Sequence, residues 1–108
     1  MTMKTGLKVV SLMLTLAFAG TALAAHDVKD GNAYVSPVKS DRYEIDGNIM
    51  GKAELYGVIA DLRDTDHLTG VVLRNGGNDD QAKVIQSICK TLGLKAFRED
   101  IGGLKPLD

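Results

Sequence analysis

The sequence predicts an α+β fold in which one amphipathic helix covers a small antiparallel sheet, with the elements in the order β-β-β-α-β. Two observations carry this prediction. Apolar residues recur at three- and four-residue spacing between Asn78 and Gly93, which is typical of an amphipathic helix. Short apolar and β-branched runs separated by turn residues lie on both sides of that segment, which favours strands. We expect the helix to lie on the sheet, because neither element can bury its apolar face alone.

The first 24 residues have the layout of a secretory signal peptide. Lys4 and Lys8 give a positive start, an apolar run follows over residues 9–20, and small residues precede a cleavage point that we place after Ala24. The apolar run is shorter than the roughly 20 residues that span a bilayer, so we expect no transmembrane anchor after cleavage. The sequence therefore predicts export to the periplasm of a Gram-negative bacterium.

Cleavage would leave residues 25–108, which is enough chain for one small domain. Removal of Lys4 and Lys8 takes the formal net charge from −1 to −3. The remaining charges are mixed along the chain without a basic stripe, so we expect neither nucleic acid nor an anionic lipid surface as partner. A single cysteine cannot form a disulfide within the chain, so stability has to come from the core or from a partner.

Residues 25–40 are interpreted as a flexible N-terminal arm that ends in an extended segment or an edge strand. The stretch "AHDVKDGN" at residues 25–32 is polar and has no period, as is common near chain ends. Pro37 argues against a central strand, because proline cannot donate a ladder hydrogen bond. The folded domain is then expected to span residues 41–108.

Three strands are expected before the helix. Residues 42–45, "RYEI", alternate polar and apolar side chains, and Asp46-Gly47 follows as a two-residue hairpin signal, because both central positions of a type I′ turn need a positive φ. Residues 48–62 are expected to return as one long strand that contains two glycines. Residues 68–74 are rich in β-branched side chains and are expected to form the third strand.

The helix is expected over about 14 residues between an N-cap at Asn78 and a left-handed stop at Gly93. Asp79 and Asp80 fall in its first turn, where negative charge favours the helix dipole. A last strand is expected over residues 94–97, followed by a polar, glycine-rich tail.

Cys89 shares the apolar side of this helix with Ile85 and Leu92, so we interpret it as a small buried core residue. An intermolecular disulfide and a nucleophilic role remain alternatives. A reactive thiolate favours a helix N-terminus or nearby cations, whereas Cys89 lies near the helix C-terminus. The chain contains no CxxC motif, so the sequence gives no support for an oxidoreductase.

No catalytic or cofactor-binding constellation emerges from the sequence. No serine of the mature chain lies in a nucleophile elbow, and the "DGN" at residues 46–48 lacks the remaining ligands of a calcium loop. The glycines of "NGGNDD" at residues 75–80 lack the GK[ST] of a phosphate-binding loop. His67 lies in a polar turn beside two aspartates and is interpreted as a solvated side chain. We therefore expect no enzyme and no bound cofactor.

Three residues are candidates for binding. If cleavage follows Ala24, the new amino terminus and the imidazole of His26 could together hold copper or zinc, although a metal site needs three or four convergent ligands. Tyr43 and Tyr56 flank the expected hairpin. These tyrosines could line a recognition surface, or they could pack against the helix.

Three segments resemble the YdgH/BhsA/McbA-like family of small enterobacterial periplasmic proteins. "GLKAFR" at residues 93–98 is similar to the helix stop and following strand of that family, and "MGKAELYG" at residues 50–57 is similar to another of its strands. "TGVVLRNG" at residues 69–76 lies where the family has its pre-helix strand. In the family the strand similar to "KAELYG" follows the helix, whereas here that segment precedes it. The resemblance implies a periplasmic role in stress response or biofilm regulation, without an active site.

The sequence thus favours a small exported, non-enzymatic binding or stress-response protein. We expect it to contact a protein or another envelope component through a sheet face or a sheet edge. A periplasmic inhibitor or immunity protein against a cell-wall hydrolase or toxin is the first alternative, and metal carriage at the mature N-terminus is the second. The pattern of residues indicates no particular oligomeric state.

Overall fold

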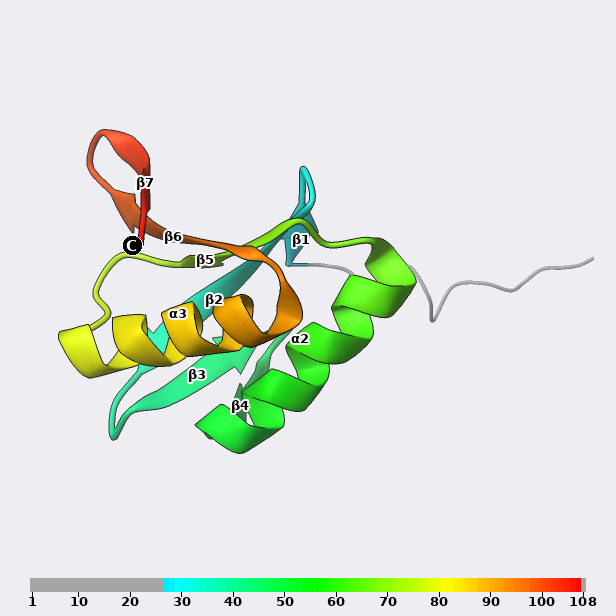
Figure 1. Ribbon diagram of the computed structural model, residues 1–108. Helices are drawn as coiled ribbons and strands as arrows, with labels where there is room; N and C mark the ends of the chain where they lie inside the picture. The colour runs from blue at the N-terminus through cyan, green and yellow to red at the C-terminus, as the bar shows by residue number, and fades with distance from the viewer. Residues whose placement is uncertain (1–26, 108) are drawn as a thin grey trace, which may run out of the picture.

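Two helices lie on one side of a mixed seven-stranded sheet in the computed structural model, which describes residues 27–107 (Figure 1). The strands are β1 (Val28–Lys29), β2 (Asn32–Val38), β3 (Arg42–Ile45), β4 (Asn48–Met50), β5 (Gly70–Leu73), β6 (Lys95–Asp100) and β7 (Gly103–Pro106). The helices are α2 (Lys52–Asp66) and α3 (Asp79–Leu92). The predicted signal peptide, its cleavage point and His26 lie outside the described residues.

The strand order across the sheet is β4-β3-β2-β5-β6-β7, and β1 pairs with β2 beside this path. The two central pairings, of β2 with β5 and of β5 with β6, are parallel, and the outer pairings are antiparallel. Parallel neighbours need a long crossover, and here α2 and α3 provide the two crossovers. The prediction of an α+β protein is confirmed, whereas a purely antiparallel sheet with one helix is wrong.

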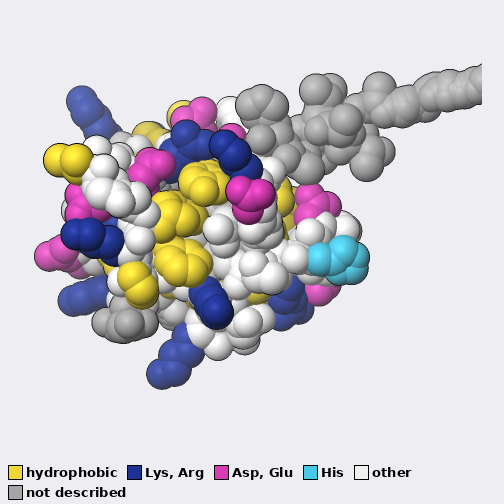
Figure 2. Space-filling view, turned by 90° about the horizontal axis from the view of Figure 1, so that it is seen from above, with side chains coloured by type: hydrophobic (Ala, Val, Ile, Leu, Met, Phe, Trp, Pro, Cys, Tyr) yellow, Lys and Arg dark blue, Asp and Glu magenta, His cyan; other side chains and the backbone are white. Residues whose placement is uncertain are grey.

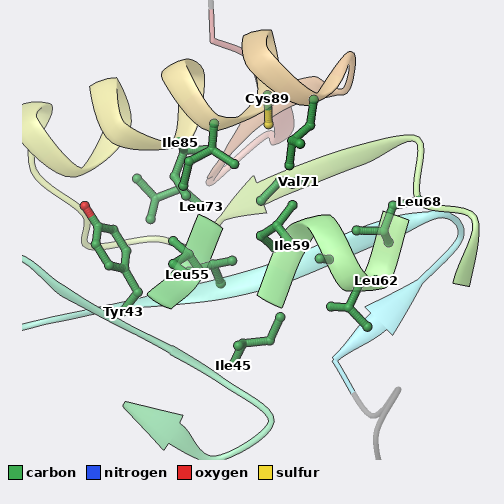
Figure 3. Packing of buried hydrophobic residues seen from close by; sticks show 14 of the residues in the cluster. Tyr43, Ile45, Leu55, Ile59, Leu62, Leu68, Val71, Leu73, Ile85 and Cys89 are labelled. Atoms are coloured by element: carbon green, nitrogen blue, oxygen red, sulfur yellow. The ribbon is translucent and has the colours of Figure 1, made fainter. Parts of the chain in front are cut away.

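The hydrophobic core lies between the helices and the sheet face that they cover (Figure 3). The sheet contributes Val71 and Leu73 from β5, and α2 contributes Leu55 and Ile59, all of them fully buried. Helix α3 adds Ile85 among others from its apolar side. Full burial of one such side chain contributes about 1.5–3 kcal/mol, so this layer accounts for most of the stabilisation of the fold. Neither α2 nor α3, the helices of the described region, is long and apolar enough to cross a bilayer.

Helix α2 replaces most of the long strand that the sequence predicts over residues 48–62. Strand β4 ends at Met50, and α2 begins two residues later. The buried residues of α2 are Leu55, Ile59 and Leu62, whose spacing of four and three is that of a helix face rather than of a strand. Gly57 is tolerated in the helix because its position is exposed and a side chain there would meet nothing within 4 Å.

Strand β2 occupies the centre of the sheet, so the prediction of a flexible arm or an edge strand is wrong for residues 32–38. The strand pairs with β3 on one side and with β5 on the other. Its pairing with β5 covers only residues 32–35, whereas Pro37 lies opposite Tyr43 of β3. The proline is therefore accommodated where the described sheet has a neighbour on one side only.

The turn between β3 and β4 has the predicted geometry. Asp46 and Gly47 have φ values of 52° and 82°, and they connect the paired residues Ile45 and Asn48. Two consecutive positive φ values are those of a type I′ turn. The Asp46 carboxylate also accepts a hydrogen bond from the backbone N–H of Asp27 at 2.7 Å, and the Asp27 carboxylate accepts one from the Asp46 N–H at the same distance. This exchange attaches the start of the described chain to the turn.

Helix α3 has the predicted limits. Asn78 is the N-cap, and its side chain accepts a hydrogen bond from the Gln81 N–H, while the Gln81 side chain accepts one from the Asn78 N–H. Gly93 ends the helix with φ 73°. The following strand is longer than predicted, because β6 extends to Asp100 and the expected polar tail returns along it as β7.

Candidate functional site

The face of the sheet opposite the helices carries a row of apolar side chains. The register places Tyr34, Val72, Phe97 and Pro106 side by side on four neighbouring strands. Paired residues project from the same face, and Val72 lies outside the core cluster that includes both of its chain neighbours. Leu104 belongs to the same face, because its partner Glu99 is two residues from Phe97. We name these five residues the open sheet face.

The absence of a side chain at Gly70 allows the side chains of this row to pack closely. A Cβ at Gly70 would lie 2.5 Å from Asn32 Oδ1 and 3.1 Å from Phe97 Cε2. The missing side chain therefore lets the Phe97 ring rest close to the β5 backbone. Val72 in the middle of the row is fully buried, whereas Leu104 towards the sheet edge is 41% exposed. The accessible part of the surface thus lies towards β6 and β7.

Charged groups of both signs lie at one end of the row. The Arg74 guanidinium lies 5.3 Å from the centroid of the Tyr34 ring, and one of its nitrogens is 3.7 Å from an Asp27 carboxylate oxygen. Together with Lys29 and Glu99 these residues line a hollow of about 230 Å³. Figure 2 shows a group of apolar side chains surrounded by basic and acidic ones. Such an apolar centre with a polar rim is the usual anatomy of a protein interface.

The β6–β7 hairpin extends this surface beyond the body of the protein (Figure 1). Lys105 Nζ lies 3.0 Å from an Asp100 carboxylate oxygen across the hairpin. The hydrogen bond from Lys105 lowers the pKa of Asp100, with a smaller contribution from the Ile101 N–H. The Ile101 side chain at the tip is fully exposed. An apolar side chain held in that position is available for contact with another molecule.

The two predicted tyrosines lie in different environments. Tyr43 is 1% exposed and packs in the core beneath the helices (Figure 3), where burial raises the pKa of its hydroxyl and the charges of Asp41 and Asp80 raise it further. Tyr56 is 39% exposed on α2 and lines a hollow of about 560 Å³ between α2 and α3. The structure does not bring the two tyrosines together on one surface.

Cys89 is buried in the core on α3 (Figure 3). Burial raises the pKa of its thiol to about 12, although a hydrogen bond with the backbone of Val71 acts in the opposite direction. A thiol in this state carries very little thiolate at neutral pH, and thiolate is the nucleophilic form. Only 1% of the Cys89 surface is exposed, which disfavours a disulfide with a second chain.

No metal site is formed by the described histidine. His67 is the C-cap of α2, in the left-handed conformation with φ 56°, and its side chain is exposed. Among residues 27–107, no three His, Cys, Asp or Glu side chains lie close enough together to hold a metal ion.

The open sheet face was not predicted from the sequence. The alternation of residues 33–38 and 95–100 was a usable signal, because Tyr34 and Phe97 each stand between residues of the opposite face. The missing information was the register. The row depends on parallel pairings between segments that are far apart in the chain.

Comparison with protein-family models, with curated proteins and with solved structures finds no match. The geometry of the molecule is therefore the basis for the function proposed below.

Proposed function

We propose that this chain is a small exported, non-enzymatic binding protein that holds a protein partner on its open sheet face. The observation that carries the proposal is the apolar row from Tyr34 to Pro106 on a sheet face that neither α2 nor α3 covers. Apolar surface rimmed by polar residues marks interaction sites. The accessible part of this face is Leu104 and Pro106 on β7, because Val72 in the middle of the row is fully buried. The role in envelope stress response that the family resemblance implies is one setting for such an interaction.

The charges around the row favour a protein as partner. Arg74 and Lys29 lie beside Asp27 and Glu99, so the rim has no single sign. A polyanion such as nucleic acid would be attracted by a continuous positive surface. A protein interface combines an aromatic or apolar centre with pairs of opposite charge, and Tyr34 and Phe97 supply the aromatic rings.

The hairpin tip favours a second candidate function, that of a periplasmic inhibitor or immunity protein. Ile101 is fully exposed on a hairpin that projects from the sheet (Figure 1). A side chain presented in this way can enter a cleft on a secreted hydrolase or toxin. In that case Ile101 would be the main anchor, and the open sheet face would form the flank of the interface.

Site-specific photo-crosslinking in the producing cells tests the proposal. A photoreactive amino acid at position 104 should give one defined adduct, because Leu104 lies at the exposed part of the open sheet face. The same amino acid at position 61, on the exposed side of α2, should give none. The substitution Pro106→Asp places a charge within the row and should abolish the adduct from position 104.

Two outcomes decide between the candidates. If the adduct contains a cell-wall hydrolase or toxin and disappears with Ile101→Gly, the inhibitor function is correct. If position 61 gives the same adduct as position 104, the open sheet face is not the binding surface.

A further inference from the structure

The loop between β5 and α3 contains the dipeptide Asn75-Gly76, in which an asparagine is followed directly by a glycine. Asparagine is a chemically labile residue, because the backbone nitrogen of the next residue can attack its side-chain amide carbon. A glycine in that next position has no side chain to hinder the attack. Asn75 is the one asparagine of the chain that precedes a glycine.

Both reacting groups of this dipeptide are accessible in the structure. Asn75 and Gly76 are exposed. Within residues 27–107, neither the side-chain amide of Asn75 nor the N–H of Gly76 takes part in a hydrogen bond. Outside the neighbouring residues, the atom nearest to a Cβ built at Gly76 would be Pro37 Cγ, at 3.9 Å. The attacking nitrogen and the amide carbon can therefore approach each other without first breaking a contact.

The chain on either side of the dipeptide is held in place. Before it, the Arg74 N–H donates a hydrogen bond to the Val35 carbonyl at 2.8 Å. After it, Asn78 is the N-cap of α3. The exposed dipeptide is confined to the few residues between these two points, so β5 and α3 can stay folded while it reacts.

The other three asparagines of the chain lack these features. Asn78 Oδ1 accepts a hydrogen bond from the Gln81 N–H at 2.8 Å, and Asn78 Nδ2 donates one to Asp41 at 2.9 Å. Asn32 and Asn48 lie in β2 and β4, and they are followed by alanine and isoleucine. A side chain on the following residue hinders the attack, so these positions serve as internal references.

We propose that Asn75 is a site of spontaneous modification in the folded protein, at which its amide is replaced by a carboxylate. The Gly76 nitrogen forms a bond with Asn75 Cγ, the Cγ–Nδ2 bond breaks, and ammonia leaves with the proton of the Gly76 N–H. Water then opens the resulting succinimide ring. Opening at Cγ gives aspartate, and opening at the main-chain carbonyl carbon gives isoaspartate. The reaction consumes water, releases ammonia and needs no oxidant or reductant.

The conversion changes the rim of the open sheet face. The Asn75 N–H donates to Glu99 Oε1 at 3.4 Å, and Glu99 lines the same hollow as Asp27, Lys29 and Arg74. The new carboxyl group is ionised at neutral pH, so it adds a negative charge beside two acidic and two basic side chains. In the isoaspartate form the main chain between β5 and α3 is also longer by one methylene.

Incubation of the purified mature protein at neutral pH tests the proposal. A form with one more negative charge should accumulate, while circular dichroism shows that the protein stays folded. Trypsin cleavage after Arg74 and Lys83 releases Asn75 and Asn78 in one peptide, so tandem mass spectrometry of that peptide compares the two sites directly. Asn75 should be converted to aspartate and isoaspartate, and Asn78 should remain intact. The conversion should be faster at pH 8.5 than at pH 6, because the attacking nitrogen has to lose its proton.

Two variants locate the reaction. Asn75→Gln keeps the amide but lengthens the side chain, so the ring that would form is larger and less favourable, and the acidic form should not appear. Asn48→Gln is the matched control, because Asn48 is also exposed and its side chain makes no hydrogen bond within the described residues. This control should be converted at the rate of the parent protein. Both positions are exposed, so thermal unfolding should show that both variants are folded.

Three results would overturn the proposal. Conversion of Asn78 or Asn48 as fast as that of Asn75 would show that the exposed dipeptide is not selected. Undiminished formation of the acidic form in Asn75→Gln would place the reaction at another residue. Conversion of Asn75 in the urea-unfolded protein, without conversion in the folded protein over the same time, would show that the folded loop prevents the attack.

Discussion

Gln81 is the one buried polar residue of the described chain, with 3% of its surface exposed, and its substitution tests how α3 is attached to the sheet. Its side-chain oxygen accepts a hydrogen bond from the Asn78 N–H at 3.0 Å. Its side-chain nitrogen donates to the carbonyls of Val38 and Arg42, both at 3.0 Å. One amide thus connects the helix cap to the ends of both strands of the β2–β3 hairpin.

The substitution Gln81→Met keeps the length of the side chain and removes all three hydrogen bonds. Each bond contributes about 0.5–1.5 kcal/mol net, and the thioether regains part of the loss through apolar burial. We expect a decrease of about 2–3 kcal/mol in the free energy of unfolding. In a domain of this size each kcal/mol corresponds to a shift in Tm of about 4–8 °C.

The substitution Gln81→Glu gives a sharper test. At pH 7 the carboxylate cannot donate and faces the Val38 and Arg42 carbonyl oxygens, so it should destabilise more than methionine does. Protonation restores one donor, so the deficit relative to the parent protein should shrink between pH 7 and pH 4. The assay is urea unfolding followed by far-UV circular dichroism, with both proteins compared at each pH.

Gln86→Met is the matched control, because Gln86 lies on the same helix and makes no side-chain hydrogen bond within the described residues. It should change stability by less than about 0.5 kcal/mol. If Gln81→Met is no more destabilising than Gln86→Met, the attachment of α3 does not depend on the amide, and the reasoning above is refuted.

Three further predictions concern single positions. Burial raises the pKa of the Cys89 thiol from 9.0 to about 12, so just above pH 9 the thiol ionises only in the unfolded state. The free energy of unfolding of the parent protein should therefore fall from pH 9 upwards more steeply than that of Cys89→Ala. Equal pH slopes of the two proteins in urea unfolding would contradict this. Gly57→Ala should raise the free energy of unfolding by about 0.5–1 kcal/mol, because alanine has the higher helix propensity. Gly70→Ala should lower it by about 1–3 kcal/mol, because the new Cβ would clash with Asn32 and Phe97. Thermal unfolding should therefore show Tm shifts of opposite sign for the two variants. Gly47→Ala should cost about 1 kcal/mol because φ is +82° there, while Gly47→Asn should retain most of the stability, which the same assay measures.

Local signals in the sequence were sufficient for α3 and for the first hairpin. Asn78, Gln81 and Gly93 act within the helix that they delimit, and Asp46-Gly47 acts within its own turn. In both cases the residues that determine the conformation are neighbours in the chain. The physical cause can therefore be identified without knowledge of the fold.

Helix α2 was missed because residue propensity and the spacing of the apolar residues point to different structures in this segment. Tyr56, Val58 and Ile59 favour strands, and Gly57 weakens a helix. The spacing of Leu55, Ile59 and Leu62 was the correct indicator, since those are the side chains that the sheet and α3 bury. Tertiary packing outweighs the propensity of the exposed residues here.

The open sheet face could not be predicted, because it combines distant segments. The open sheet face requires residue 34 to lie beside residue 72, and residue 72 beside residue 97. Neither side-chain type nor local periodicity contains this information.

The central position of β2 has a consequence for the order in which the chain can assemble. Asn32 pairs with Gly70 and Val35 with Leu73. The edge of β2 that faces β5 therefore stays unpaired until nearly forty more residues of the chain have followed β2. If the chain crosses a membrane N-terminus first, as the predicted signal peptide implies, β2 emerges early and its partner β5 late. The β2–β3–β4 meander can form in the meantime, but the core cannot close before β5 and α3 arrive. Completion of translocation would then set the time at which this protein folds.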